Sequence, residues 1–317
     1  MPDEPANKNS AFDDPDPSHS DQWSEWLLRR RYGGDPGHEP NVRSMVERIR
    51  DRVLDGAELQ PGMVLVDVGA GDGLTAFGAF QRVGPSLKAI LVDVSRSLLA
   101  HAEQRAIEAG VRDRCAFLET SAELLEGVAD DCADVVTTRA VLAYVADKEA
   151  AFRRFFRVLK SHGRLSIAEP INRDEAVNVA AFASFLQSPA ANRVSPAVRL
   201  MNRCRQAQLP ATLNQIAKDP VTNFSERDLV AMAQKAGFDE IHLELHIDVF
   251  RYPAVPWDTY IDMAPRPGTP TLREVFATHL TGPEREQLEA SLRPMVECGR
   301  HRMRETTAYL TASKSGF

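Results

Sequence analysis

The sequence predicts an α/β protein built around a mostly parallel β-sheet. Two apolar runs rich in β-branched side chains, residues 63–68 and 89–94, are typical of strands buried on both faces. A helical pattern begins at about Leu74, after the first run, and further helical patterns cover residues 96–109 and 148–159. Strands that alternate with helices of this length indicate a parallel sheet with helices on both faces.

Composition narrows the class of protein. The chain has 317 residues, 43% of them hydrophobic, which is enough for one large domain with or without a lid. A net charge of −7 argues against a surface built for nucleic acid. No apolar run reaches the length of a membrane span, and the first residues lack the pattern of a signal peptide. We therefore expect a cytoplasmic monomer or homodimer that binds neither nucleic acid nor membrane.

The most informative stretch is residues 63–77, in which Gly69, Gly71 and Gly73 follow a buried strand and precede a helix. Glycines let the backbone turn sharply and let a ligand approach it closely. A dinucleotide fingerprint would need a glycine where this chain has Leu74, and a phosphate-binding loop would need a lysine followed by Ser or Thr. The remaining alternative is a purely structural turn between strand and helix.

The pattern Asp67-x-Gly69-x-Gly71-x-Gly73 resembles motif I of the class I S-adenosylmethionine-dependent methyltransferases. Asp93 ends the second apolar run a little over 20 residues later, where an acidic side chain can accept both hydroxyls of a ribose. An NAD site would place a carboxylate in the same way, so Asp93 supports an adenosine ligand without choosing between the two cofactors.

Further segments extend the resemblance over residues 60–170. Residues 114–123 resemble the third-strand motif of the family, with Ser121 where many members have Asp. Residues 134–142 resemble the fourth strand, residues 157–165 resemble the turn before the fifth strand, with Ser161-His162 in place of Pro-Gly, and residues 167–170 end that strand. The resemblance implies a Rossmann-like fold with a seven-stranded, mostly parallel sheet, and S-adenosylmethionine as cofactor, with S-adenosylhomocysteine as its product.

The resemblance also implies a set of site residues. Those expected to contact the cofactor are Asp67, Gly69, Ala70, Gly71, Gly73, Asp93, Val94, Ser121, Ala122 and Arg139. Arg139 could hold the methionyl carboxylate or an acidic substrate, and its alternative role is an ion pair with Glu169 or Asp67. Tyr144 and Glu169 are the candidate bases, although a carboxylate acceptor needs none. Candidate substrate contacts, besides Arg139, are Tyr32, Asn172 and Arg173.

The sequence outside residues 59–170 predicts additions to this core. Residues 1–20 are polar and predicted to be disordered. Residues 21–58 form a helical cap, in which an amphipathic helix carries Trp23, Trp26 and Tyr32. We interpret the run Arg29–Arg31 as a solvated helix end rather than a nucleic-acid contact. Core elements return in residues 224–250 and 305–317, with strands expected at 240–250 and 306–314.

Two helical insertions, residues 171–223 and 251–304, interrupt the core and are expected to form a lid that selects the substrate. His242 and His246 alternate with apolar residues on the sixth strand, which indicates sheet-surface residues rather than catalysts. The four cysteines fit no metal-binding spacing and are interpreted as packing residues, so no metal is expected.

These observations favour a methyltransferase that acts on oxygen, nitrogen or carbon of a small molecule or peptide, with a carboxylate as one candidate acceptor. The resemblance is to bacterial natural-product tailoring enzymes. The alternatives are a quinone- or sterol-type C-methyltransferase, a non-catalytic S-adenosylmethionine-binding regulatory module, and an NAD-dependent oxidoreductase, which Leu74 disfavours.

Overall fold

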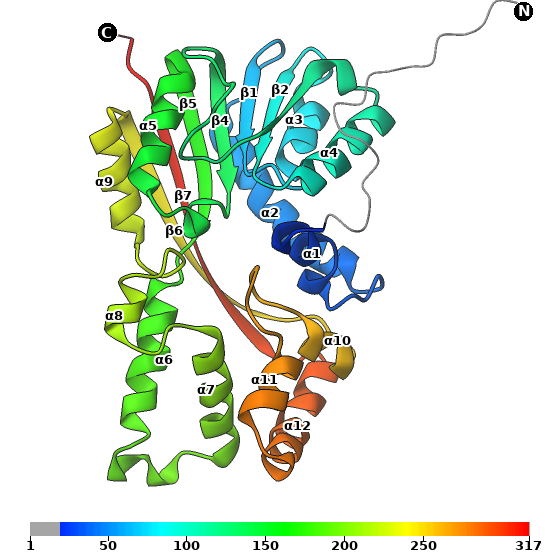
Figure 1. Ribbon diagram of the computed structural model, residues 1–317, viewed down its shortest axis with the longest axis vertical. Coiled ribbons are helices and arrows are strands. Elements are labelled where there is room, and N and C mark those ends of the chain that lie inside the picture. The colour runs from blue at the N-terminus through cyan, green and yellow to red at the C-terminus, as the bar shows by residue number, and fades with distance from the viewer. Residues whose placement is uncertain (1–19, 317) are drawn as a thin grey trace, which may run out of the picture.

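The strands of the described chain form one mixed sheet in the order β3-β2-β1-β4-β5-β7-β6 (Figure 1). The computed structural model describes residues 20–316, so the predicted tail lies outside the described residues except for Ser20. The strands are β1 (Val64–Val68), β2 (Lys88–Asp93), β3 (Cys115–Glu119), β4 (Ala133–Arg139), β5 (Leu159–Pro170), β6 (Asp239–Arg251) and β7 (Arg302–Ser313). Strands β1 to β5 pair in parallel, whereas β7 runs antiparallel to both β5 and β6.

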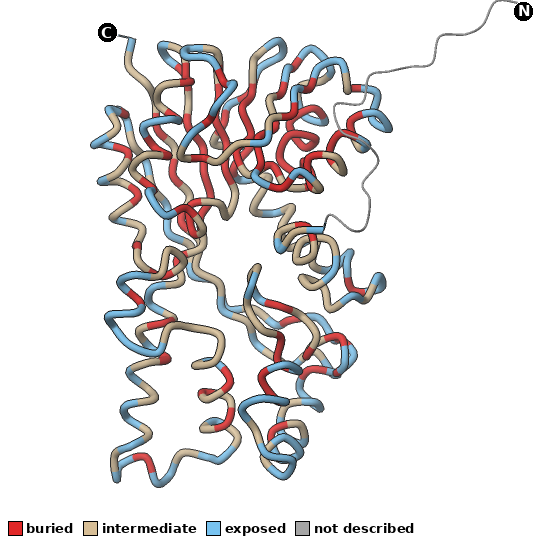
Figure 2. The backbone as a smooth tube through the Cα atoms, viewed as in Figure 1, coloured by how far each residue is buried: buried red, intermediate tan, exposed pale blue. Residues whose placement is uncertain are grey.

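Helices cover both faces of the sheet, as predicted. On one face, α2 (Glu39–Ala57), α3 (Leu74–Val83) and α4 (Arg96–Glu108) bury apolar side chains such as Leu54 and Leu99. On the other face, α5 (Lys148–Val158) and α9 (Glu226–Ala236) bury Phe152, Phe155 and Leu229. The buried backbone is concentrated in this part of the molecule (Figure 2). Because the sheet is covered twice, its parallel strands are apolar along their length.

The N-terminal segment is shorter and more broken than its sequence pattern predicts. Helix α1 (Gln22–Leu28) begins at Asp21, whose carboxylate accepts hydrogen bonds from the backbone N–H groups of Trp23 and Ser24. The chain then continues as the 3₁₀ turn η2 (Arg30–Tyr32), which ends at Gly33 in a left-handed conformation. This break places Arg30 and Arg31 on a separate turn from the tryptophans.

The two helical insertions pack against each other. The first contains α6 (Arg173–Phe185), η5 (Pro189–Arg193), α7 (Pro196–Gln208) and α8 (Leu213–Ile216). The second contains α10 (Trp257–Asp262), α11 (Leu272–His279) and α12 (Gly282–Glu297). They share an apolar cluster that includes Leu200 and Cys204 of α7, Trp257 of α10, Phe276 of α11 and Leu288 of α12. We call this body of helices the helical layer; it lies below the sheet in Figure 1.

Strands β6 and β7 extend beyond the rest of the sheet. Their pairing continues to Arg251 opposite Arg302, so β7 begins four residues earlier than the predicted start at 306. The sequence pattern missed this extension because Met303 is the single apolar residue among residues 302–305. In Figure 1 the two strands run as a ribbon from the core down to the helical layer.

The turn expected before the fifth strand is part of the strand itself. Strand β5 runs without interruption through Ser161 and His162, and its pairing with β4 shifts register between Ala133 and Val135. His162 adopts a φ of 63°, a conformation that usually favours glycine. Its N–H donates to the carbonyl of Lys314, with 2.8 Å between N and O, which holds this conformation in place.

Within residues 20–316 we consider membrane spans, metal-binding clusters, cysteines and the remaining short turns. None of the helices in this range is both long and apolar enough to cross a membrane. No group of three or more His, Cys, Asp or Glu side chains in the range could hold a metal ion. All four cysteines are free thiols; Cys115 and Cys204 are buried and Cys298 is exposed. Two short 3₁₀ turns complete the fold, η3 (Arg112–Arg114) and η4 (Leu142–Tyr144).

Candidate active site

The glycine turn joins the carboxyl end of β1 to helix α3. Gly69, Gly71 and Gly73 all have positive φ, at 67°, 56° and 77°. A Cβ on Gly69 would lie 2.2 Å from Val141 Cγ2, and one on Gly73 would lie 2.3 Å from a ring carbon of Phe77. A Cβ on Gly71 would meet only Leu27, at 3.8 Å. The turn is therefore too tightly packed for a Cβ at Gly69 and Gly73, whereas a Cβ at Gly71 would fit in ordinary contact with Leu27.

Asp93 lies beside this turn at the end of β2. Its Oδ2 accepts the N–H of Gly71 at 2.8 Å, and its Oδ1 accepts the N–H of Ser95 at 2.9 Å. Burial raises the pKa of Asp93, against the effect of these two donors. Each carboxylate oxygen has a second lone pair, so the group can still accept hydroxyls. The next side chain, Val94, is 49% exposed and offers an apolar surface beside the carboxylate.

Asp67 lies beneath the turn rather than on its open side. The side chain is buried, and its oxygens accept hydrogen bonds from Thr137 Oγ1 at 2.9 Å and from the N–H of Ala76 at 3.2 Å. Burial raises the pKa of Asp67 to about 7. Its contacts tie β1 to β4 and to the first turn of α3. This geometry favours a role in positioning the glycine turn.

The end of β3 lies next to that of β2, because Asp93 pairs with Glu119. Thr120 donates its N–H to the carbonyl of Asp93 at 3.1 Å, which brings Ser121 to the same edge of the sheet. The Ser121 carbonyl accepts from Leu125 in a short turn, and Ala122 is buried. Ser121 and Ala122 thus follow the strand next to Asp93, as the sequence predicts.

Helix α1 packs over the glycine turn. Leu27 is the side chain nearest to Gly71, and the charge of Asp21 acts on Asp93. The ring of Trp23 contacts that of Tyr144 edge-on, with 5.1 Å between centroids. Residues far apart in the sequence therefore meet at the carboxyl ends of the strands.

Arg139 is the last residue of β4, at the same edge of the sheet. It makes no ion pair with Glu169 or Asp67, which was its alternative role, and has no hydrogen-bond partner among residues 20–316. Burial lowers its pKa, and the nearby charges of Asp72 and Asp67 oppose that effect. Asp72 itself pairs with Arg105 and Arg43, at 2.9 and 3.2 Å between nitrogen and oxygen. Arg139 thus remains available to a ligand.

Arg31 is a site residue that the sequence interpretation missed. Its guanidinium lies over the ring of Trp26 at 5.1 Å, and the described chain gives it no ion-pair or hydrogen-bond partner. Burial and the like charge of Arg139 lower its pKa to about 9, so it stays protonated at pH 7. Its neighbour Arg30 instead pairs with Glu274 at 2.7 Å. The arginine run is therefore not simply a solvated helix end; the only sequence signal for Arg31 was its position beside the tryptophans.

The two candidate bases differ in environment. Glu169 is fully buried, and its carboxylate accepts the N–H groups of Val141, Leu142 and Ala143 at 2.9–3.2 Å, as well as Thr138 Oγ1 at 3.2 Å. It therefore holds the turn η4 in place, and these donors favour a positioning role over that of a base. Burial raises the pKa of Tyr144, the last residue of η4, to about 12. A phenol with this pKa stays protonated at neutral pH, so it does not carry the negative charge of a phenolate base.

The other candidate substrate contacts are engaged elsewhere. Tyr32 donates its hydroxyl to the carbonyl of Leu28 within its own turn, which favours a structural role. Asn172 donates to the carbonyl of Val221 at 3.5 Å, and Arg173 pairs with Asp228 at 3.6 Å. These two residues connect the start of α6 to the segment around α9, at the junction between core and helical layer.

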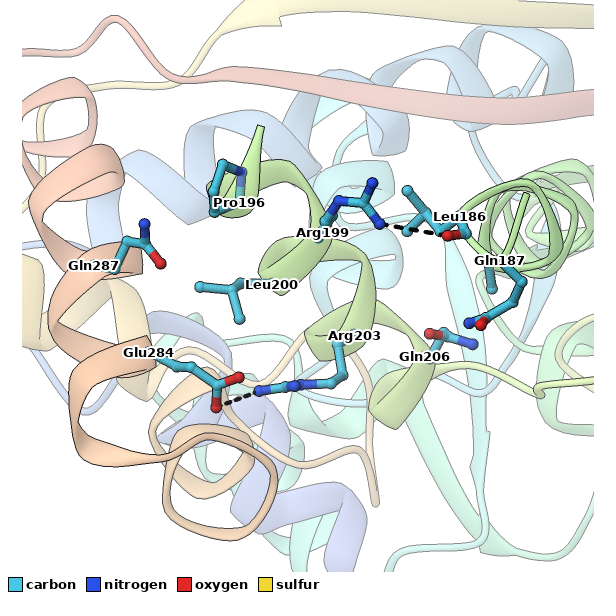
Figure 3. Close-up of a pocket in the computed structure, with 10 residues that line it drawn as sticks. Leu186, Gln187, Pro196, Arg199, Leu200, Arg203, Gln206, Glu284 and Gln287 are labelled. Carbon is cyan, nitrogen blue, oxygen red and sulfur yellow. Dashed lines mark hydrogen bonds and ion pairs between the residues drawn. The ribbon is translucent and has the colours of Figure 1, made fainter. Parts of the chain in front are cut away.

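Two cavities lie in the helical layer, and none of these residues lines either of them. One, of about 470 Å³, is enclosed by α6, α7 and α12 and is lined by Arg199, Leu200 and Gln287 among others (Figure 3). Arg203 pairs there with Glu284 at 2.6 Å. A second cavity lies near Gln208 and Pro270. The candidate site residues lie instead at and just beyond the carboxyl ends of β1, β2, β3 and β4.

The residues at the strand ends fit S-adenosylmethionine. Gly71 has no Cβ to obstruct the close approach of a ligand, and Asp93 retains acceptor capacity for a ribose. Val94 presents an apolar surface to a base, and Arg139 is an unpaired cation of the kind that binds a carboxylate. An NAD-type pyrophosphate site would need a glycine at Leu74, which is buried in the first turn of α3.

Comparison with known proteins agrees with this fit. The family described as "Methyltransferase domain" matches residues 59–237, more than half of the chain. The ubiquinone/menaquinone biosynthesis C-methyltransferase UbiE of Hahella chejuensis is 31% identical over 116 residues, which cover 37% of this chain and 46% of that protein. Nocamycin O-methyltransferase of Saccharothrix syringae is 30% identical over 123 residues, which cover 39% of this chain and 43% of that protein. The chain thus spans about half the length of these curated relatives.

A solved structure shows the same fold. The YcgJ protein of Bacillus subtilis superposes with a TM-score of 0.53 and 19% identity, over 88% of this chain and all of that one. The sheet is mixed and mostly parallel, with helices on both faces, as in Rossmann-like methyltransferases. The chain therefore belongs to the class I S-adenosylmethionine-dependent methyltransferases, a family whose cofactor is S-adenosylmethionine.

Proposed function

We propose that the protein methylates an oxygen, nitrogen or carbon atom of a small molecule or peptide, and that the acceptor carries a carboxylate. The observation that carries this proposal is the pair Arg31 and Arg139, whose guanidinium groups lack ion-pair partners in the described chain. The charge of Arg139 lowers the pKa of Arg31, and burial lowers the pKa of both groups. Two desolvated like charges repel each other, and anions placed beside them remove that cost.

The pair can serve two carboxylates. Arg139 ends β4, the strand next to β1 and its glycine turn, and would hold the methionyl carboxylate of the cofactor. Arg31 comes from η2, on the side of α1, and is placed to hold the acceptor. When bound, S-adenosylmethionine supplies an electrophilic methyl group on a sulfonium. The role of Arg31 and Arg139 is to orient the reactants and to exclude water from between them.

The state of the candidate bases supports a carboxylate as the methylated group itself. Tyr144 stays protonated at neutral pH, and Glu169 is enclosed by its four donors. A carboxylate is already ionised at pH 7 and has no proton to lose, so its methylation requires no general base. An amine or alcohol acceptor would require one, and the described residues offer none that is well placed.

The first experiment is calorimetric titration with S-adenosylhomocysteine, with NAD as the control ligand. We expect micromolar binding of S-adenosylhomocysteine alone. Binding of NAD, or of neither ligand, would contradict the assignment of the strand ends as the cofactor site.

The second experiment identifies the acceptor atom. The protein is incubated with methyl-labelled S-adenosylmethionine and a panel of carboxylic acids, each paired with its primary amide. A methyl ester releases labelled methanol in mild base, whereas N-methyl, C-methyl and ether products do not. Base-labile product from the acids and none from the amides is expected. Base-stable product would contradict carboxyl methylation while leaving methyl transfer intact.

One other catalytic function has a specific observation in its favour. The similarity to UbiE supports C-methylation of a quinone precursor. This function would give base-stable product from a phenolic substrate. The similarity to nocamycin O-methyltransferase supports instead a place in natural-product biosynthesis. A non-catalytic regulatory module would bind S-adenosylhomocysteine and show no turnover with either class of acceptor.

A further inference from the structure

Strand β6 is an exposed sheet edge with an apolar face. It is the last strand in the sheet order, and nine of its 13 residues are exposed. Leu245, Ile247 and Val249 are 38%, 52% and 61% exposed. The exposure of these apolar side chains therefore increases along the ribbon that β6 forms with β7. A long apolar edge strand offers unpaired backbone groups to another strand.

The other face of β6 carries charge in a regular order. His242, Glu244, His246 and Asp248 alternate with the apolar residues. Within one chain, Glu244 contacts Nε2 of His246 at 3.0 Å, Nε2 of His242 at 3.5 Å and Arg52 of α2 at 2.5 Å. Acidic and basic groups therefore alternate along this face of the strand.

The pairing with β7 decides which backbone groups face the free edge. Tyr252 donates its N–H to the carbonyl of His301 at 2.8 Å, in the register that pairs Arg251 with Arg302. In an antiparallel pair, the hydrogen-bonded positions alternate along the strand. The even-numbered residues of β6 thus bond toward β7. The odd-numbered ones, including Leu245, direct their N–H and C=O groups toward the free edge.

From this arrangement we propose that two copies of the protein pair through β6 about a two-fold axis at Leu245. The two strands run antiparallel, and Leu245 of each copy exchanges two backbone hydrogen bonds with Leu245 of the partner subunit. The two sheets then continue as one. This inference rests on the edge strand and is independent of the proposed methyl transfer.

Side-chain complementarity selects this register. With the axis at Leu245, Leu243 lies opposite Ile247 of the partner subunit, on the apolar face. On the polar face, Glu244 lies opposite His246 of the partner subunit, and His242 lies opposite Asp248 of the partner subunit. Each pairing occurs twice by symmetry. An imidazole can donate a hydrogen bond to a carboxylate that lies opposite it, whereas two carboxylates in that position repel each other.

The register with the axis at Leu243 would again place an imidazole opposite Glu244, but it would pair Asp239 with the partner subunit's Ile247 and run through the irregular register between Asp239 and His242. The other neighbouring registers lack this complementarity. The two-fold axis can shift only by whole residues. A half-residue shift would place a residue whose N–H and C=O groups face the free edge opposite one whose groups already bond to β7. With the axis at Glu244, the two Glu244 carboxylates would face each other. With the axis at His246, Glu244 would face the partner subunit's Asp248. With the axis at Ile247, Leu243 would face the partner subunit's Arg251.

Sedimentation equilibrium of the full chain tests the dimer. We expect a monomer–dimer equilibrium for the wild type, and a dissociation constant at least about tenfold higher for Leu245→Lys, which places two ammonium groups opposite each other. Ile107→Lys is the matched control, because Ile107 is 49% exposed on α4 at the other side of the sheet. Binding of S-adenosylhomocysteine reports that each variant is folded. A monomeric wild type, or a dimer unaffected by Leu245→Lys, overturns the proposal.

Disulfide trapping tests the register. Single cysteines are introduced in a Cys298→Ser background, because Cys298 is exposed. Residues in a directly opposed hydrogen-bonded pair have Cα atoms about 5.5 Å apart, within reach of a disulfide. Leu245→Cys should therefore cross-link under oxidation. Ile247→Cys should not, because its two copies lie about 13 Å apart along the strand. Equal cross-linking of both variants overturns the register.

Discussion

Asp93 Oδ2 accepts a hydrogen bond from the backbone N–H of Gly71, with 2.8 Å between the two atoms. This contact ties the end of β2 to the one glycine of the turn at which a Cβ would meet no atom closer than 3.8 Å. A ligand that approaches Gly71 must therefore also meet the Asp93 carboxylate. The two residues that the sequence pattern proposed separately act as one structural unit.

Asp93→Ala should weaken S-adenosylhomocysteine binding by about 1.5–3 kcal/mol, because charged hydrogen bonds to the ribose are lost. Calorimetric titration measures the change. Asp113→Ala is the control, because the Asp113 side chain is 76% exposed on η3 and lies away from the strand end. Unchanged affinity in Asp93→Ala would refute the proposed ribose contact.

Alanine substitutions in the glycine turn should separate the energetic cost of backbone strain from that of a steric collision. Gly71→Ala should cost about 1–3 kcal/mol of folding free energy because its φ is 56°. Gly69→Ala should cost more, since its Cβ would also lie 2.2 Å from Val141 Cγ2. Urea unfolding measures both. In the Val141→Ala background the excess cost of Gly69→Ala should shrink; if it does not, the collision is not its source.

Glu169→Gln should reduce kcat by disturbing the turn that carries Tyr144. The amide keeps one acceptor oxygen but turns a donor toward the N–H groups of η4, which leaves at least one of them unsatisfied at a cost of about 1–3 kcal/mol. Thermal unfolding should show the loss of stability. The pH dependence of kcat should keep the shape of the wild type. Loss of one ionisation from that profile would instead identify Glu169 as the base.

Asp67 should make the protein less stable as the pH rises. Its pKa is raised by burial from the model-peptide range near 4 to about 7 in the folded chain. Between these values the folded state keeps a proton that the unfolded state has lost, so the free energy of unfolding falls as the pH increases toward 7. Asp67→Asn should flatten this part of the profile, measured by urea unfolding from pH 5 to 8. An unaltered slope would exclude Asp67 as its source.

Arg31→Gln should raise the KM for a carboxylate acceptor by about tenfold or more, from the loss of a charged hydrogen bond. Its effect on S-adenosylhomocysteine affinity should be small, whereas Arg139→Gln should weaken that affinity. Arg29→Gln is the matched control, because the Arg29 side chain is 74% exposed near the same turn. Steady-state kinetics and calorimetry together separate the two roles. Equal effects of Arg31→Gln and Arg29→Gln would rule out an acceptor contact.

The sequence by itself determined the core of this protein. The apolar runs, the spaced glycines and Asp93 follow rules of local structure. A strand buried on both faces is apolar, a tight turn with positive φ favours glycine, and a polar residue directly after an apolar run indicates the end of a strand. The family and the placement of the glycine turn at the carboxyl ends of the strands could be predicted on that basis.

Tertiary structure alone decided the rest of the candidate site. Arg31 and Arg139 are separated by more than a hundred residues, and so are Trp23 and Tyr144, yet each pair meets at the strand ends. Nothing local in the sequence distinguishes Arg31, which lies near Arg139, from Arg30, which pairs with Glu274. The directions of these two side chains depend on how α1 and η2 pack against the core. The partner of each side chain is fixed by packing between distant segments, and not by the periodicity of the segment that carries it.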